Sequence, residues 1–499
     1  MTEIPSPSAY QKLLDLSKEL ALLQDTEALL SWDQETQMPR DGVAWRAEQM
    51  AWLGGEIHRR FTREEVGDWI AECEAAGLPE DSDADANVRE WRHGYDRATK
   101  LPSALVEEFE KTRALAKSAW AEARKASDFP AFAPHLEKLI TLSREKAENW
   151  GYEDALYDSL IDDFERGAKS ADLKALFDGL RPQLVAIADE ALSREPFEHS
   201  KLAGSYPQAQ QEAFNREVAE AVGFDFNAGR IDTAVHPFCT GLGPRDTRLT
   251  TRYDETDFRS SLYGVLHEAG HGLYDQGLRG DCHGQPVGRA VSLGVHESQS
   301  RLWENHVGRS LAFWNRWLPR AIHYFPHLQG LTPEEMTRAC NQAERSFIRV
   351  EADEVTYDLH IMLRFEIELA VFNGDLAIAD IPGEWNRRFE DFFGLKIDQD
   401  SNGCLQDIHW SLGIFGYFPT YSLGNLNASH LYAAALSQQP EIKTQLGAGD
   451  YSGLLGWMRE NIHQPGSRYL PKDLVTRAAG SPATPDAHLA HLRNRYLAS

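Results

Sequence analysis

The chain has 499 residues and a mass of 56.2 kDa, which is long enough for a large core or several domains. Its 51 Lys and Arg against 77 Asp and Glu give a net charge of −26, which argues against nucleic acid and anionic membranes as partners. The chain shows no secretory signal, no apolar run near the roughly 20 residues of a membrane helix, and five scattered cysteines without a CxxC pair. We therefore expect a cytoplasmic protein without a disulfide framework.

Helical periodicity dominates the first 220 residues. The predicted helices there are Tyr10–Leu30, Ala44–Phe61, Ser103–Ala126, Phe132–Trp150 and Ser170–Arg194. Between about 224 and 257 the chain is rich in Gly, Pro, Asp and Thr, with one strand-like stretch at Leu249–Tyr253. Helical periodicity then returns around residue 267, through Glu297–Phe313 and Pro333–Phe372, and is broken by Gly403–Gly424. The sequence predicts a mostly α-helical body with its irregular segments near residue 267.

The most informative motif is His-Glu-Ala-Gly-His at residues 267–271. At about 100° per residue, His267, Glu268 and His271 share one arc of a helix, so both imidazoles can bind one zinc ion. A glutamate beside the first histidine can take a proton from a water on that zinc. The opposite face is an apolar stripe formed by Leu262, Val265, Leu266, Ala269 and Leu273. Gly270 and Gly272 cost about 1 kcal/mol each in a helix, which predicts close approach of another backbone or a substrate.

A catalytic zinc usually has three protein ligands and one open position. Downstream of His271 the segment His296-Glu297-Ser298-Gln299-Ser300-Arg301 continues to Glu304. Glu297 is the preferred third ligand, and His296 and Glu304 compete with it. Spacing alone leaves these alternatives open.

Two later segments carry further candidates. In Ile348–Tyr357, read as one helix, Arg349 can clamp a substrate carboxylate, and Asp353 or Glu354 can orient a metal-bound imidazole. The alternative is a surface helix with charge pairs. In the aromatic stretch 403–421, the polar groups of His409, Tyr417 and Tyr421 form a plausible donor set for an oxyanion.

Several motifs together resemble one family. They are HEAGH, HESQS, IRVEADEVTY, GCLQDIHW, FGYFPTYSLG, HPF (236–238), DTRLT (246–250) and WDQETQMP (32–39). They lie between residues 32 and 424, in the order along the chain that the family has, and they resemble the carboxypeptidase Taq (M32) family of metallocarboxypeptidases.

This resemblance implies one peptidase domain over residues 1–499. It comprises a helical N-terminal part (about 1–223), site segments (about 224–424) and a helical C-terminal part (about 425–499). The implied fold is a largely helical body divided by a deep substrate groove, similar to the gluzincins neurolysin and angiotensin-converting enzyme. The implied enzyme is a homodimer that holds one Zn²⁺ per chain, with Co²⁺ able to substitute, and removes C-terminal residues with broad specificity but accepts C-terminal proline poorly.

The same resemblance assigns residues. The implied zinc ligands are His267, His271 and Glu297, with Glu268 as the general base. The implied substrate contacts are His236, Arg349, His409, Tyr417 and Tyr421. For the substrate carboxylate we prefer Arg349, with Arg245 and Arg248 as rivals, and for the oxyanion Tyr421 with His409 or Tyr417.

Two other functions use the same motif. A gluzincin endopeptidase or a peptidyl-dipeptidase shares the zinc helix, and cleavage of a peptide with a free C-terminus compared with its C-terminal amide distinguishes these readings. A non-catalytic helical scaffold with structural zinc is the third reading, although structural zinc usually has four protein ligands and no adjacent base.

Overall fold

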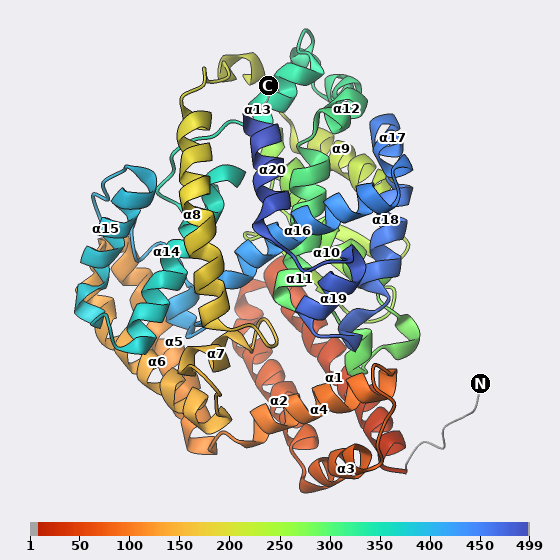
Figure 1. The fold of residues 1–499 in the computed structure, drawn as a ribbon, viewed down its shortest axis with the longest axis vertical. Helices are drawn as coiled ribbons and strands as arrows, with labels where there is room; N and C mark the ends of the chain where they lie inside the picture. The colour runs from red at the N-terminus through yellow and green to blue at the C-terminus, as the bar shows by residue number, and fades with distance from the viewer. Residues whose placement is uncertain (1–7, 498–499) are drawn as a thin grey trace.

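Helices form most of the structure, a computed structural model that describes residues 8–497 (Figure 1). The helices before the sheet are α1 (Ser8–Thr36), α2 (Val43–Phe61), α3 (Glu64–Ala75), α4 (Asp83–Thr99), α5 (Ser103–Ala126), α6 (Phe129–Trp150), α7 (Leu156–Ile161), α8 (Ser170–Leu192) and α9 (Gln208–Ala221). Those up to the middle of the site region are α10 (Phe258–Gly277), α11 (Leu293–Arg301), α12 (Leu311–Tyr324), α13 (Pro333–Cys340) and α14 (Glu354–Asn373). The last are α15 (Ile381–Phe393), α16 (Pro419–Gln438), α17 (Glu441–Ala448), α18 (Ser452–Met458), α19 (Pro471–Ala479) and α20 (Pro485–Tyr496). The predicted mostly α-helical fold is confirmed; residues 1–7 and 498–499 of the predicted domain lie outside the described range.

The predicted helix through Pro333–Phe372 is wrong in its middle, because the chain leaves the helical path between α13 and α14. In this break the backbone N–H of Arg349 donates to the side chain of Gln406, and a 3₁₀ turn spans Arg349–Glu351. Asp353 then caps α14 by accepting from the backbone N–H groups of Val355 and Thr356. Tertiary contacts replace helical hydrogen bonds in this break, and the hydrophobic periodicity of the sequence does not predict such contacts.

The predicted helix Glu297–Phe313 is also divided. Helix α11 passes into a π-helix at Leu302–Gly308, and α12 begins after Ser310, whose hydroxyl accepts from the N–H of Phe313. A π-helical turn inside an α-helix often marks a functional site. Here it follows directly on the helix that carries Glu297.

A small sheet precedes α10. Its strands are β1 (Gly229–Thr233), β2 (Cys239–Gly241) and β3 (Thr247–Thr251), in the order β1-β3-β2. Strand β3 pairs in parallel with β1, Ile231 opposite Leu249, and antiparallel with β2, Cys239 opposite Leu249. The sequence predicted one strand near β3; β1 and β2 are short and contain Gly or Asp, so they lack an alternating pattern. α10 packs on this sheet.

Two large apolar cores organise the body. One is built mainly from α9, α10, α12 and α16–α18, including Trp303 and Trp314, and the other from α5, α6, α8, α14 and α15, including Phe177 and Phe365. In Figure 1 the second group lies on the left and the first on the upper right, with α1–α4 below. α16 contributes to both cores and packs closely on α11. Among residues 8–497, none of the helices combines the length and apolar character that a bilayer crossing requires.

Candidate metal centre and active site

Helix α10 carries the HEAGH motif. It begins after Asp257, whose side chain accepts from the N–H of Arg259. The predicted apolar stripe of this helix is fully buried in the first core, as the residues Leu262, Val265, Leu266, Ala269 and Leu273 show. One face of α10 is therefore fixed by packing, and the two histidines point from another face toward α11.

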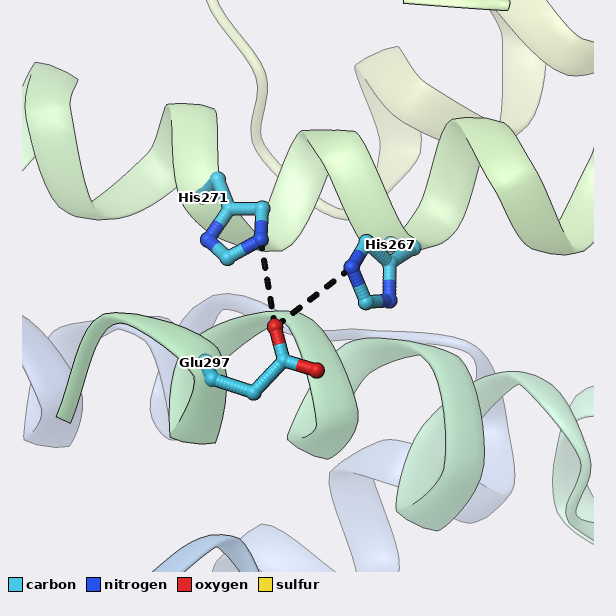
Figure 2. Close-up of side chains that lie close together, drawn as sticks. All are labelled: His267, His271 and Glu297. Atoms are coloured by element: carbon cyan, nitrogen blue, oxygen red, sulfur yellow. Dashed lines mark ion pairs between the residues drawn. The ribbon is translucent and has the colours of Figure 1, made fainter. Parts of the chain in front are cut away.

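Glu297 of α11 meets the two histidines of α10 (Figure 2). Its Oε2 lies 3.6 Å from Nε2 of His267 and 3.5 Å from Nε2 of His271. A tetrahedral zinc ion with bonds of about 2.0–2.1 Å separates its ligand atoms by about 3.4 Å. The three side chains could therefore hold a metal ion with little rearrangement. We call His267, His271 and Glu297 the catalytic cluster.

The outer nitrogens of both histidines have partners. Nδ1 of His267 lies 2.9 Å from Oε2 of Glu304, and Nδ1 of His271 lies 2.6 Å from Nδ1 of His296. His296 in turn places Nε2 3.2 Å from Asp275. Although burial opposes it, neighbouring carboxylates raise the pKa of His267 to about 9, so a metal ion would have to displace the proton from its Nε2. With the proton on each outer nitrogen held by its partner, both Nε2 atoms would then present a lone pair to the metal. Glu304 and His296, the competitors for third ligand, instead lie behind the histidines.

Close packing holds α11 in place. A Cβ atom on Gly270 of α10 would lie 2.5 Å from the carbonyl oxygen of Gln299, and one on Gly424 of α16 would lie 2.5 Å from Cγ of Glu297. The close approach predicted for Gly270 is therefore to the backbone of α11. At the start of α11, Glu165 accepts from the N–H of Gly294 at 3.0 Å. These contacts leave Glu297 little freedom to move away from the histidines.

The carboxylates of the site differ in charge state. Burial opposes ionisation of Glu297, but Arg301 and the histidines hold its pKa well below its usual range. Nε of Arg301 donates to Oε1 of Glu297 at 2.7 Å, which leaves Oε2 facing the histidines. For the buried side chain of Glu268, burial is the largest effect and raises the pKa to about 7. Glu297 is thus a permanent anion, whereas Glu268 can exchange a proton near neutral pH.

A cavity of about 650 Å³ opens over this centre and is bordered by residues of both cores. Its lining includes Tyr263, His267, Glu268, Glu297, Arg301, Glu304, Arg309, Arg349, Tyr357 and Tyr421. This cavity is the groove expected between two halves of a helical body. It is large enough to admit a small ligand beside Glu268.

Arg349 is held rigidly at the border of this cavity. Its Nε and Nη2 donate to Oδ1 of Asp407 at 3.0 and 2.8 Å, and its Nη1 donates to the phenol oxygen of Tyr357 at 2.9 Å. Arg364 donates to the other oxygen of Asp407 at 2.6 Å, so two guanidinium groups hold the pKa of this buried carboxyl far below its usual range. The cation of Arg349 is therefore fixed in direction.

The chain matches the carboxypeptidase Taq (M32) metallopeptidase family over residues 12–496. Thermostable carboxypeptidase 1 of Thermus thermophilus is 42% identical, covering 98% of this chain and 99% of the relative, and carboxypeptidase 1 of Bacillus subtilis is 34% identical over 98% of both. The chain belongs to the M32 family. Among solved structures, the M32 carboxypeptidase of Deinococcus radiodurans superposes with a TM-score of 0.94 at 39% identity, covering 98% and 99% of the two chains. Pyrococcus furiosus carboxypeptidase gives 0.95 at 33% identity, covering 99% and 100%.

The protein is accordingly a metal-dependent carboxypeptidase, and its predicted family, helical fold and enzyme class are confirmed. In this M32 enzyme the predicted oxyanion donors gather on the second core. Tyr421 borders the cavity, and Nε2 of His409 lies 3.4 Å from its phenol oxygen. The rings of Tyr417 and Tyr421 lie 5.3 Å apart. Burial lowers the pKa of His409 to about 4, so this imidazole is neutral at pH 7.

The remaining predicted substrate residues are not among those that line the cavity over the M32 metal centre. His236 is exposed, next to Pro237, which borders the cavity. Arg245 pairs with Asp225 at 3.0 Å and lines a different cavity of about 790 Å³. Arg248 pairs with Asp246 and lies over the ring of Trp32 at 4.3 Å. Of the three candidate arginines, Arg349 is the one that borders the cavity over the metal centre.

Sequence reasoning missed three functional contacts. Asp407, which fixes Arg349, stands two residues before His409 in the same motif, and this position was the available signal. Tyr357 borders the cavity and carries the guanidinium of Arg301 over its ring at 4.5 Å. The partner of a metal-binding imidazole was expected at Asp353 or Glu354, but Glu304 makes that contact with His267, because Asp353 caps α14 and Glu354 binds His491.

Proposed function

We propose that this M32 enzyme is a zinc-dependent carboxypeptidase that removes single C-terminal residues with broad specificity and accepts C-terminal proline poorly. The observation that carries the proposal is the preformed set of His267, His271 and Glu297 with the buried Glu268 beside it, under one cavity. Two nitrogens and one carboxylate oxygen are donors that suit zinc, and Co²⁺ is expected to substitute. One metal ion in this cluster and assembly as a homodimer complete the proposal.

His267, His271 and Glu297 would hold the metal ion, which would supply a Lewis acid that activates the attacking water near pH 7. Glu268 takes the proton of the attacking water on its carboxylate and passes it to the nitrogen of the leaving amino acid. Burial raises the pKa of Glu268 above its ordinary value, which favours a carboxyl that both accepts and releases a proton. Arg301 keeps Glu297 ionised during this exchange.

Tyr421 donates its phenol O–H to the oxyanion that develops on the scissile carbonyl, and His409 or Tyr417 supports it. One such donor contributes about 3–4 kcal/mol to stabilisation of the transition state. Burial raises the pKa of Tyr421 far above its ordinary value, so its phenol stays protonated and can donate a hydrogen bond.

Arg349 binds the free carboxylate of the substrate and thereby selects the C-terminal residue. A guanidinium carries five N–H groups. Within residues 8–497, three of those of Arg349 donate to Asp407 and Tyr357, so two remain to bind a ligand. The rigid fork matches the geometry of a carboxylate.

The test compares N-terminally blocked tripeptides that end in a free carboxylate with the same peptides as C-terminal amides. We expect release of the last residue from the free acids, little from the amides, and the slowest release when that residue is proline. Loss of activity on chelation and its return with zinc or cobalt checks the metal. Equal cleavage of acids and amides would favour an endopeptidase and overturn the proposal.

A further inference from the structure

A second group of histidine and glutamate side chains lies away from the catalytic cluster. One potential ligand atom from each of His306, Glu354 and His491 falls within 4.8 Å of the other two. His306 belongs to the π-helix after α11, Glu354 is the first residue of α14, and His491 lies on α20. We call these three residues the second cluster. It offers the same donor types as the catalytic cluster, two imidazoles and one carboxylate.

The second cluster is tightly packed. Nε2 of His491 lies 2.7 Å from Oε1 of Glu354, and the rings of His306 and His491 lie 3.9 Å apart at an angle of 39°. The phenol of Tyr496 donates to Oε2 of Glu354 at 3.3 Å. All three side chains of the cluster are largely withdrawn from solvent. Close imidazoles against one buried carboxylate are an arrangement that a divalent cation stabilises.

A chain of hydrogen bonds sets the tautomer of His306. Asp358 lies 2.9 Å from Nε2 of His488, Nδ1 of His488 lies 2.9 Å from Oγ of Ser429, and this hydroxyl lies 3.1 Å from Nε2 of His306. The carboxylate of Asp358 accepts from His488. The single proton of the Ser429 hydroxyl is used on the carbonyl oxygen of Asn425, 3.1 Å away, or on Nδ1 of His488, and in either case the hydroxyl oxygen accepts from Nε2 of His306. Nδ1 of His306 then carries the lone pair, as in metal sites where an outer partner orients the ligand.

The electrostatics also favour metal binding. Burial and the neighbouring imidazole lower the pKa of His306 far below its usual value, so this ring stays neutral and one of its nitrogens carries no proton. His491 and Arg495 lower the pKa of Glu354, so its carboxylate is charged despite burial. The guanidinium of Arg495 is a repulsive charge, but it donates to the carbonyl oxygens of Asn305 and His306. We expect the second cluster to bind metal more weakly than the catalytic cluster.

The second cluster borders a cavity through which ions can enter. This cavity of about 1020 Å³ is lined by His306, Ser429, His491 and Tyr496, among others, and lies between the end of α8, α13, α16 and α20. α20 packs against both α8 and α16 (Figure 1). Water from the cavity can complete the coordination shell, because three protein ligands leave one position open.

We propose that the second cluster is a second metal site of this protein, which takes a zinc-class divalent cation and ties α20 to α14. The proposal goes beyond the carboxypeptidase activity and does not depend on it. Binding would replace the hydrogen bond between His491 and Glu354 by bonds to the ion, and the single ring proton of His491 would move from Nε2 to Nδ1 through water.

The test uses the full chain with the substitution His271→Gln, which removes a ligand of the catalytic cluster. After chelation, reloading with zinc and gel filtration, we expect one bound zinc per chain in this variant and none after adding His491→Gln. Zinc should raise the thermal midpoint of the first variant and leave that of the double variant unchanged. With Co²⁺ in place of zinc, the d–d absorption of a nitrogen- and oxygen-bound ion should follow the same pattern.

The matched control adds His430→Gln to His271→Gln, because His430 of α16 contacts the carbonyl of Ser481 and belongs to neither cluster. This control should still bind one zinc. Glu354→Gln serves as a second test if His491→Gln does not fold, and it should weaken binding at least tenfold. Absence of zinc from the His271→Gln variant, or equal zinc in the variants with and without His491, would overturn the proposal. None of these readouts measures peptide hydrolysis, so failure of the proposed function would leave them intact.

Discussion

The catalytic cluster and the second cluster use the same residue types but differ in spacing. In the catalytic cluster the carboxylate oxygen of Glu297 stands 3.5 and 3.6 Å from the two imidazole nitrogens, the separation that a tetrahedral ion requires. In the second cluster Glu354 and His491 are in direct hydrogen-bond contact at 2.7 Å. Arg301 and Ser300 donate hydrogen bonds to the carboxylate of Glu297 and restrain it. Within residues 8–497, the carboxylate of Glu354 has hydrogen bonds to Tyr496 and His491 only.

This difference shows how a protein prepares a site for reaction. The catalytic cluster is held open and has a buried proton acceptor, Glu268, beside it. The second cluster is closed on itself and is flanked by the hydroxyl of Ser429. A preorganised, open set suits catalysis, since no energy is spent on separating the ligands. A contracted set suits a structural ion that binds more weakly.

The largest expected effect tests the role of Glu268 in this comparison. Glu268→Gln should lower kcat by about 10²–10⁴-fold, because the amide cannot take the proton of the attacking water. Metal content, measured by atomic spectroscopy, should stay at the wild-type value. The control is Glu212→Gln, at an exposed position of α9, which should keep full activity. If the Glu268→Gln enzyme binds zinc and keeps near-normal turnover, Glu268 is not the proton acceptor that distinguishes the catalytic cluster from the second cluster.

The second effect concerns Glu165, the buried carboxyl that accepts from the N–H of Gly294 at the start of α11. Burial raises the pKa of Glu165 from 4.5 to about 7, whereas Glu354 has cationic and imidazole neighbours. The folded state therefore binds a proton that the unfolded state releases, and this contribution to stability, present below pH 4.5, is lost as the pH rises to about 7. A shift of this size corresponds to about 3 kcal/mol in the free energy of unfolding.

Glu165→Gln should abolish this loss, since a neutral amide can still accept from the N–H of Gly294. Urea unfolding at several pH values should give the variant a flatter profile than wild type. Glu137→Gln, at an exposed position, should behave as wild type. Parallel pH profiles for wild type and Glu165→Gln would show that this carboxyl does not titrate as inferred.

The third effect separates the two clusters by their outer partners. Glu304→Gln weakens the contact to Nδ1 of His267 and should lower metal affinity of the catalytic cluster about 10–100-fold. Competition with a chromophoric chelator measures this change. Affinity at the second cluster, measured in the His271→Gln background, should not move. An equal loss at both clusters would indicate general destabilisation instead of a local effect.

The smallest effect concerns substrate binding by Arg349. Arg349→Lys keeps the positive charge but removes the paired N–H donors of the guanidinium that bind a carboxylate. We expect KM for peptides with a free C-terminus to rise about tenfold with little change in kcat. Steady-state kinetics on one blocked tripeptide measures both constants. Arg245→Lys is the matched control, because Arg245 is exposed and lines a different cavity. A rise in KM for Arg245→Lys alone would reassign the carboxylate contact.

Much of the catalytic cluster could be read from the sequence because its geometry is local. Two histidines four residues apart share a helix face by the pitch of the backbone, and Glu268 follows directly on the first. The burial of the apolar stripe and the need for Gly270 were predicted by the same reasoning. The family resemblance supplied Glu297 as third ligand, where spacing had left His296 and Glu304 open, and its side chain is the one that meets both histidines.

The sequence by itself determined a helical fold, a metallopeptidase motif and the family, since periodicity and short motifs are properties of neighbouring residues. Only the tertiary structure decided the break in the helix before α14, the pairing of β1 and β2 with β3, and the anchoring of Arg349 by Asp407. The second cluster belongs to this group as well, because its ligands come from three segments far apart in the chain. Such contacts depend on how whole helices pack, and no local pattern records that packing.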